Sequence, residues 1–200
     1  MRTFNGFQWE LGKWYETTGE GKFYSSGWLH FYSDPLMGLF LNSTHANIEN
    51  PRLFRAEVEG KFLDDHGLKC GYTKARLVEE LPVPQISLVQ RVRFAILCAK
   101  KVYKEKEWNK WANNWLSGKD RTEKSAAIEI YTIQIAMEST AESAEESAFY
   151  AAKSAESAAI VVYIAQSAME SATSAAFAVR IATQNKKIDL IKIAQKAMKE

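Results

Sequence analysis

Eleven side chains in the first half of the chain have the chemistry needed to bind a nucleotide. Aromatic rings can stack on a base, while ammonium and guanidinium groups bind phosphate oxygens. The predicted ligand-binding residues are Trp28, His30, Tyr32, His45, Arg52, Lys69, Tyr72, Lys74, Arg76, Arg91 and Arg93. The same residue types also serve in cores and on ordinary surfaces, so a purely structural role for this set is the competing interpretation.

The spacing of these residues predicts that several of them share a face. Successive side chains of a strand point to opposite faces, so residues two apart point the same way. A strand over residues 28–32 would present Trp28, His30 and Tyr32 together, and a strand after Gly67 would present Tyr72, Lys74 and Arg76. Such faces could form one wall of a binding pocket.

The sequence contains no recognisable catalytic or metal-binding motif. The histidines at positions 30, 45 and 66 are not at metal-ligand spacing, and two isolated cysteines, Cys70 and Cys98, do not complete a site. A phosphate-binding loop, a dinucleotide fingerprint and a nucleophile elbow are all absent. We therefore expect no catalytic residue, no metal and no cofactor, and we expect both cysteines to be reduced, buried thiols.

One enzymatic pattern stays open as an alternative. The triplet Glu57-Val58-Glu59 resembles the Glu-x-Glu of ADP-ribosyltransferases, which have a small β-rich fold. Both glutamates, however, fall on the polar face of an alternating strand, where side chains are ordinarily solvated. The arginine and serine partners that such an enzyme needs are not clearly placed.

The elements that must position these side chains change character near residue 84. Residues 1–84 are rich in aromatic and β-branched residues divided by glycines, which predicts a β-rich α+β domain. A short helix or turn is expected at residues 36–41. The predicted strands cover residues 7–11, 13–17, 21–24, 28–32, 53–59 ending at Gly60, and 68–81, the last being one bent strand or a strand pair around Gly71.

Residues 85–200 predict an all-helical region. Ser87 is a suitable N-cap for a helix that runs to about Tyr103. A second helix is expected over residues 105–117, where tryptophans recur at helical spacing and favour packing over base stacking. A short amphipathic helix is expected over residues 186–200.

Alanine and serine dominate residues 120–185. Small residues recur there in alternating steps of three and four, beginning at Ala141, and this heptad seam predicts close helix packing. Repeated segments such as 154–158 and 169–172 fit several stacked short helices as well as one continuous helix. We expect a homo-oligomer that assembles through these helices.

Composition and charge limit the classes of partner. The 200 residues are 46% hydrophobic and 25% charged, as in a globular protein. We find no signal peptide and no run of roughly 18 apolar residues, so we expect a cytoplasmic protein without a membrane partner. Residues 61–124 carry 14 basic against 8 acidic side chains. That excess suits a small anion but is too sparse for duplex DNA, so no nucleic-acid partner is expected.

A Gly-aromatic-His segment with a nearby proline is followed by an acidic strand that ends in glycine. The two parts are Gly27-Trp28-Leu29-His30-Phe31-Tyr32-Ser33-Asp34-Pro35 and residues 53–60. They resemble a small domain of unknown function found in tailed phages and their bacterial relatives, with further similarity at 45–52, 67–71, 90–96, 111–112 and 115–121. Members of that group often carry an alanine-rich helical tail. The resemblance implies a bacteriophage accessory protein that acts in the host cytoplasm.

The resemblance and the residues together predict a function. Small phage proteins outside the virion genes are frequently inhibitors of host defence, which is an argument by association. We therefore expect a non-enzymatic viral protein that binds a nucleotide immune signal and acts as a sponge for it. Two alternatives remain: an inhibitor that binds a host defence protein by its surface, and an ADP-ribosyltransferase-like enzyme.

Overall fold

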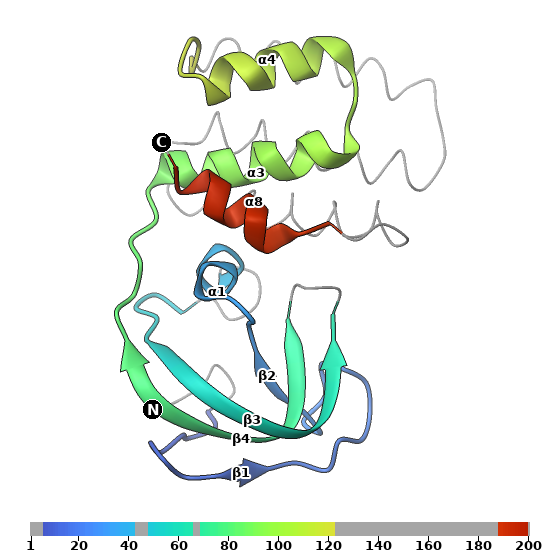
Figure 1. The fold of residues 1–200 in the computed structure, drawn as a ribbon, viewed down its shortest axis with the longest axis vertical. Helices are drawn as coiled ribbons and strands as arrows, with labels where there is room; N and C mark the ends of the chain where they lie inside the picture. The colour runs from blue at the N-terminus through green and yellow to red at the C-terminus, as the bar shows by residue number, and fades with distance from the viewer. Residues whose placement is uncertain (1–5, 43–47, 66–68, 123–187, 200) are drawn as a thin grey trace. The chain divides into compact units, whose positions relative to one another are not determined.

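The computed structural model describes residues 6–42, 48–65, 69–122 and 188–199, and the chain divides into two compact units, Met1–Gln85 and Ile86–Glu200 (Figure 1). The first unit contains an antiparallel four-stranded sheet and a helix, so the predicted α+β class is confirmed. Most of the alanine-rich region with its heptad seam lies outside the described residues, and its helical structure stays a prediction. None of the helices in the described ranges is both long and apolar enough to cross a membrane.

Strand β4 (Cys70–Leu81) is the centre of the sheet (Figure 1). Strand β3 (Leu53–Asp64) pairs with one edge of β4 in a long hairpin. The two short strands β1 (Tyr15–Glu16) and β2 (Leu29–Phe31) both pair antiparallel with β4, β1 at residues 74–75 and β2 at residues 70–72. Residues from three distant parts of the chain therefore meet along one strand.

The strand predicted over residues 53–59 was expected to end at Gly60, which is wrong, because β3 continues through this glycine to Asp64. Gly60 has φ +86°, and the register between the strands shifts between Glu59 and Phe62. A Cβ at this position would lie 2.2 Å from Oγ1 of Thr73, whose hydroxyl accepts a hydrogen bond from the backbone of Lys61 at 2.9 Å. A positive φ and this close approach both require glycine, so the residue makes a β-bulge and not a terminus.

Two further predicted strands are also corrected. Residues 7–11 do not form a strand, although Leu11 makes an isolated bridge with Leu77. Residues 21–24 lie in turns, because Gly21 has φ +82° and the amide of Ser25 donates to the carbonyl oxygen of Lys22 at 2.9 Å. The aromatic residues at 23 and 24 are therefore presented by a turn.

One hydrophobic core cluster of the first unit lies against the sheet. Its buried members are Trp9, Leu29, Ala75 and Leu77, and the partly buried Tyr15, Phe31, Phe54, Ala56 and Val58 pack against them. The alternation predicted for residues 53–59 is visible here, since Phe54, Ala56 and Val58 of β3 contact this cluster. Helix α1 (Pro35–Phe40) follows β2 and begins at an N-cap, Asp34, whose side chain accepts from the amide of Leu36 at 2.8 Å.

The second unit is built on helix α3 (Leu88–Val102), which contacts both α4 (Lys106–Leu116) and α8 (Leu190–Ala197). The predicted N-cap is confirmed: Ser87 and Gln90 form a capping box. Six consecutive residues, 94–99, are buried, so α3 is covered on every side. The tryptophans of α4 are buried too, which confirms that they pack and do not stack on bases.

Candidate functional site

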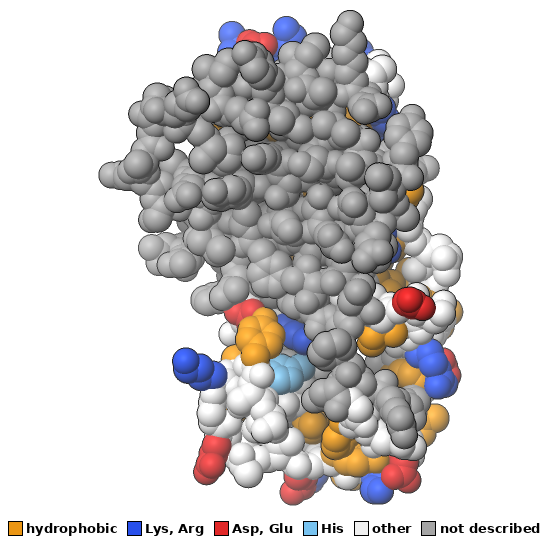
Figure 2. Space-filling view, turned by 180° about the vertical axis from the view of Figure 1, so that it is seen from behind, with side chains coloured by type: hydrophobic (Ala, Val, Ile, Leu, Met, Phe, Trp, Pro, Cys, Tyr) orange, Lys and Arg blue, Asp and Glu red, His pale blue; other side chains and the backbone are white. Residues whose placement is uncertain are grey.

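A group of aromatic and basic side chains gathers where β2 meets β4, on the Met1–Gln85 unit. We call it the aromatic–basic cluster. Its members are Phe23, Tyr24, His30, Tyr32, Asp65 and Lys69. Figure 2 shows a histidine side chain on this face beside hydrophobic and basic side chains. His30, Tyr32 and Lys69 are predicted ligand-binding residues, and the structure brings these three together.

Two glycines border these rings. Gly71 of β4 lies directly opposite His30 of β2, and a Cβ on it would be at ordinary contact distance from the rings of Phe23, at 3.4 Å, and Trp28, at 3.5 Å. Gly38 of α1 would similarly place a Cβ 3.1 Å from the ring of Tyr32. The rings can therefore lie close to the backbone of a strand and of a helix.

The surroundings of His30 favour one tautomer of its neutral ring. Its Nε2 lies 2.6 Å from the carbonyl oxygen of Phe23, which can only accept, so Nε2 carries the proton. Its ring stacks on that of Tyr24, with centroids 5.8 Å apart and planes 13° apart. Burial lowers the pKa of His30, and the charge of Lys69 lowers it further, while the hydrogen bond to Phe23 opposes both. The neutral imidazole is favoured, and its Nδ1 is the acceptor of the ring.

Lys69 places a half-buried ammonium group among the rings. Its Nζ lies 5.4 Å from the ring centroid of Tyr32 and 5.9 Å from that of Tyr24. Burial lowers the pKa of Lys69, and the nearby carboxylate of Asp65 opposes this shift. The hydroxyl of Tyr24 donates to Oδ2 of Asp65, and burial raises the pKa of Tyr32. Two tyrosine faces and one carboxylate thus stabilise a cation that is only partly hydrated.

We expect the stability of this unit to fall as the pH is lowered below about 6.5, the ordinary pKa of histidine. The folded pKa of His30 is depressed, so the unfolded state binds the proton more readily between the two pKa values. Unfolding in urea at a series of pH values measures this dependence. His30→Gln keeps a donor for Phe23 without titrating, so the slope between pH 7 and pH 5 should become smaller. An unchanged slope would show that groups other than His30 cause the pH dependence. The lowered pKa of Lys69 acts in the same direction but at higher pH, so it does not contribute between pH 7 and pH 5.

The other predicted ligand-binding residues of the sheet have structural partners. Trp28 is buried and donates from Nε1 to the carbonyl oxygen of Gly21 at 3.4 Å. Tyr72 contacts the ring of Phe62, with centroids 5.0 Å apart, and Nε of Arg52 lies 2.7 Å from Oε1 of Glu80. His45 lies outside the described residues. The role of these residues in binding a ligand stays a prediction.

Lys74 and Arg76 form a cross-strand ladder of ion pairs with the Glu-x-Glu triplet. Nζ of Lys74 is 2.9 Å from Oε2 of Glu59, and Nε of Arg76 is 2.7 Å from Oε2 of Glu57. Both cations also lie over the ring of Trp14, each 4.9 Å from its centroid. The two glutamates therefore face basic residues on the polar side of the hairpin, which is the ordinary structural arrangement.

Arg91 and Arg93 belong to the helical unit, where Arg93 serves the ends of two helices. Its Nη1 donates to the carbonyl oxygen of Leu116 at 3.0 Å, and its Nη2 donates to that of Lys199 at 2.7 Å. Burial lowers the pKa of Arg91. The predicted set of eleven residues is thus divided between two units, and only part of it contributes to the aromatic–basic cluster.

Three members of the aromatic–basic cluster, Phe23, Tyr24 and Asp65, were not among the predicted residues. A signal was present, because the aromatic pair stands between Gly21 and Gly27, and glycine-flanked aromatics in a turn are exposed more often than strand residues. Within the part of the chain that the structure describes, no group of three or more His, Cys, Asp and Glu residues could hold a metal ion. Cys70 and Cys98 are buried and unpaired with each other, as predicted for thiols.

The first unit is thus a small α+β domain that carries the aromatic–basic cluster, and the described elements of the second unit are helices. Residues 1–89 match a protein family that is described as a domain of unknown function, DUF7666. No curated protein and no solved structure matches the chain.

Proposed function

We propose that the Met1–Gln85 unit binds a small nucleotide-type anion at the aromatic–basic cluster and catalyses no reaction on it. The observation that carries the proposal is the ammonium group of Lys69, half-buried between the rings of Tyr24 and Tyr32. A cation in such a place is costly to desolvate, and binding an anionic group there recovers part of that cost.

The remaining side chains of the cluster suit the other parts of a nucleotide. The side chain of Tyr24 is 55% exposed, which leaves ring surface for a base to stack on. The neutral imidazole of His30 offers Nδ1 as an acceptor, so a hydroxyl or amino group of a ligand could donate to it. Lys69 would contact phosphate oxygens. A base, a sugar and a phosphate thus each find a chemical counterpart.

The biological role that fits this binding is sequestration of a nucleotide immune signal. It rests on the resemblance to phage proteins, together with the absence of a catalytic constellation from the sequence. Assembly through the alanine-rich helices would place several such sites in one particle. A tight, non-catalytic site repeated in an oligomer is what a protein sponge requires.

Calorimetry on the full chain tests the proposal, with a panel of cyclic dinucleotides, ADP-ribose and NAD as probes. Lys69→Gln should weaken binding of the best probe roughly 10- to 150-fold, the equivalent of a charge-assisted hydrogen bond of about 1.5–3 kcal/mol. Lys13→Gln is the matched control, because Lys13 is an exposed lysine whose partners, Glu10 and Tyr15, lie outside the cluster. The proposal is wrong if no probe binds to the folded protein, or if both variants weaken binding equally.

A second candidate function is inhibition of a host defence protein by surface contact. Phe62 and Leu63 are consecutive residues near the end of β3 and are 53% and 36% exposed. Exposed apolar residues at a hairpin end are suitable for protein contact. Pull-down from host lysate with the wild type and with Phe62→Ser separates the two candidates. A stoichiometric protein partner that binds the wild type and not Phe62→Ser would favour surface inhibition. Lys69→Gln should still bind such a partner.

A further inference from the structure

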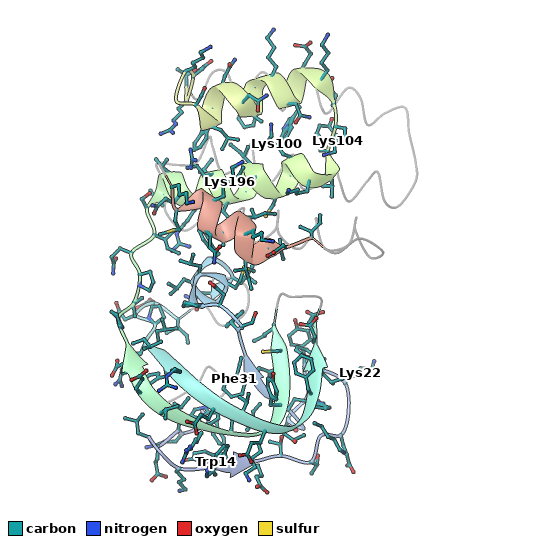
Figure 3. All side chains as sticks on the ribbon, viewed as in Figure 1. Trp14, Lys22, Phe31, Lys100, Lys104 and Lys196 are labelled. Carbon is teal, nitrogen blue, oxygen red and sulfur yellow. The ribbon has the colours of Figure 1, made fainter. Side chains whose placement is uncertain are left out.

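His30 uses one ring nitrogen to hold its position and leaves the other available. Its Nε2 donates to the carbonyl oxygen of Phe23 at 2.6 Å, and Nδ1 has no hydrogen bond within the described ranges. Phe31, which Figure 3 labels, is the next residue of β2 and packs against the core cluster of the sheet. Successive side chains of a strand point to opposite faces, so the half-buried His30 points away from that core cluster. Its Nδ1 is therefore an unused acceptor within the aromatic–basic cluster.

The ring of His30 lies nearly parallel to the ring of Tyr24. The two planes differ by 13° and the centroids are 5.8 Å apart, which is an offset stack. The imidazole thus covers only part of one face of Tyr24, which is an exposed residue. A base that stacks on the uncovered part of the same face would lie beside the imidazole and nearly in its plane.

An amino group at the edge of such a base would be well placed to donate to Nδ1. The lone pair of Nδ1 lies in the plane of the imidazole, so a donor in that plane makes the best-aligned hydrogen bond. The exocyclic amino groups of adenine, cytosine and guanine lie in the plane of their bases and are donors. An ionised phosphate has no proton to donate, and a sugar hydroxyl stands outside the plane of the base. The geometry of His30 therefore suits the base of a nucleotide better than its other parts.

We propose that His30 selects nucleotides whose base carries an exocyclic amino group, by accepting a hydrogen bond from that group at Nδ1. The selection rests on the proposed function, because a nucleotide must bind at the aromatic–basic cluster with its base on Tyr24. Affinity and selectivity then belong to different side chains. The ammonium group of Lys69, 5.9 Å from the ring centroid of Tyr24, attracts every nucleotide by its charge, whereas His30 distinguishes one base from another.

Calorimetry on the full chain tests this selection, with adenosine 5′-diphosphate and purine riboside 5′-diphosphate as probes. The two probes differ only in the amino group of the base. At pH 7 the wild type should bind the adenosine compound roughly 2- to 12-fold more tightly, the effect of one hydrogen bond. His30→Phe keeps a planar ring without an acceptor, so it should bind the two probes equally. Lys69→Gln is the matched control from the same cluster, and it should weaken both probes by one factor and leave their affinity ratio unchanged.

A pH series on the wild type tests the same selection without a substitution. Burial and the charge of Lys69 lower the pKa of His30, so its ring is neutral at pH 7 and binds a proton only at lower pH. Protonated histidine has a donor at both nitrogens and cannot accept. The affinity ratio of the two probes should therefore approach one as the ring becomes protonated, which NMR of the ring follows in the same samples. Lys69 acts on both probes alike, so its charge should not change the ratio.

The outcomes separate selection by His30 from the proposed function. Equal affinity of the wild type for both probes, with weaker binding by Lys69→Gln, overturns the selection and leaves the anion site in place. A preference for the adenosine compound that persists in His30→Phe, or after the ring is protonated, overturns it as well. If neither probe binds but another nucleotide of the panel does, the selection alone is wrong. If no nucleotide binds to the folded wild type, the proposed function is wrong too.

Discussion

Gly27→Ala is expected to destabilise the Met1–Gln85 unit by about 3 kcal/mol or more, because the added carbon overpacks the structure. A Cβ at this position would lie 2.0 Å from the carbonyl oxygen of Glu20, which is backbone and cannot rotate away. Gly27 closes the segment that presents Phe23 and Tyr24, since its carbonyl oxygen accepts from the amide of Gly19 at 2.9 Å. The substitution should therefore also disrupt the turn that carries Phe23 and Tyr24 of the aromatic–basic cluster.

Hydrogen exchange of the full chain, followed by mass spectrometry, measures this effect. Peptides from residues 19–32 should lose protection in Gly27→Ala, while peptides from α3 should be unchanged. Gly12→Ala is the control: Gly12 has φ +77° but nothing within 4 Å of its Cβ position, so this variant should cost only about 1 kcal/mol for the left-handed backbone. Equal effects of the two substitutions would show that the contact with Glu20 is not the cause.

Arg93→Met is the second substitution with a large expected effect, a loss of about 3 kcal/mol from the helical unit. The variant keeps the apolar stem but removes the donors to two carbonyl oxygens, and each charge-assisted bond contributes about 1.5–3 kcal/mol. These carbonyl groups belong to Leu116, the last residue of α4, and to Lys199, which follows α8. Thermal unfolding should begin roughly 10 °C lower, as expected for this loss in a unit of this size.

Two variants distinguish the role of Arg93 as a bridge from a simple effect of charge. Lys110→Met also removes one positive charge from the helical unit, but its partner Glu107 is 3.7 Å away at the surface, so the midpoint should change by less than about 2 °C. Arg93→Lys keeps the charge without the forked guanidinium and can reach one carbonyl group at most. A midpoint equal to that of the wild type in Arg93→Lys would contradict the bridge.

Local patterns predicted the elements that depend on local chemistry. The alternation at residues 53–59 and the capping residue Ser87 both gave correct elements, since periodicity and N-cap chemistry act within a few residues. The β-bulge at Gly60 was predicted as the end of the strand, because glycine is common both in bulges and at strand ends. Which of the two forms depends on Thr73 of the partner strand. The turn at residues 21–24 was likewise decided by glycine backbone angles that no side-chain pattern encodes.

The candidate site was predictable only in part. His30 and Tyr32 were predicted from the alternation expected over residues 28–32, and Lys69 was predicted as a basic residue able to bind phosphate. Tyr24 and Asp65 join them through contacts across 41 positions of the chain, which sequence spacing cannot show. Conversely, Lys74 and Arg76 were predicted to bind a ligand, but the register of the hairpin places glutamates opposite both of them, which the sequence does not show.

The placement of β1 and β2 along one edge of β4 has a consequence for the order of folding. The hairpin of β3 and β4 joins neighbouring segments, so its closure costs little chain entropy and should come early. The amino-terminal strands should dock later, because Tyr15 must find Ala75 and Leu29 must find Tyr72 across most of the unit. His30 is expected to join in this later step, after Lys69 has been placed by the hairpin. We therefore expect the aromatic–basic cluster to be completed last during folding and to be lost first when the unit opens locally.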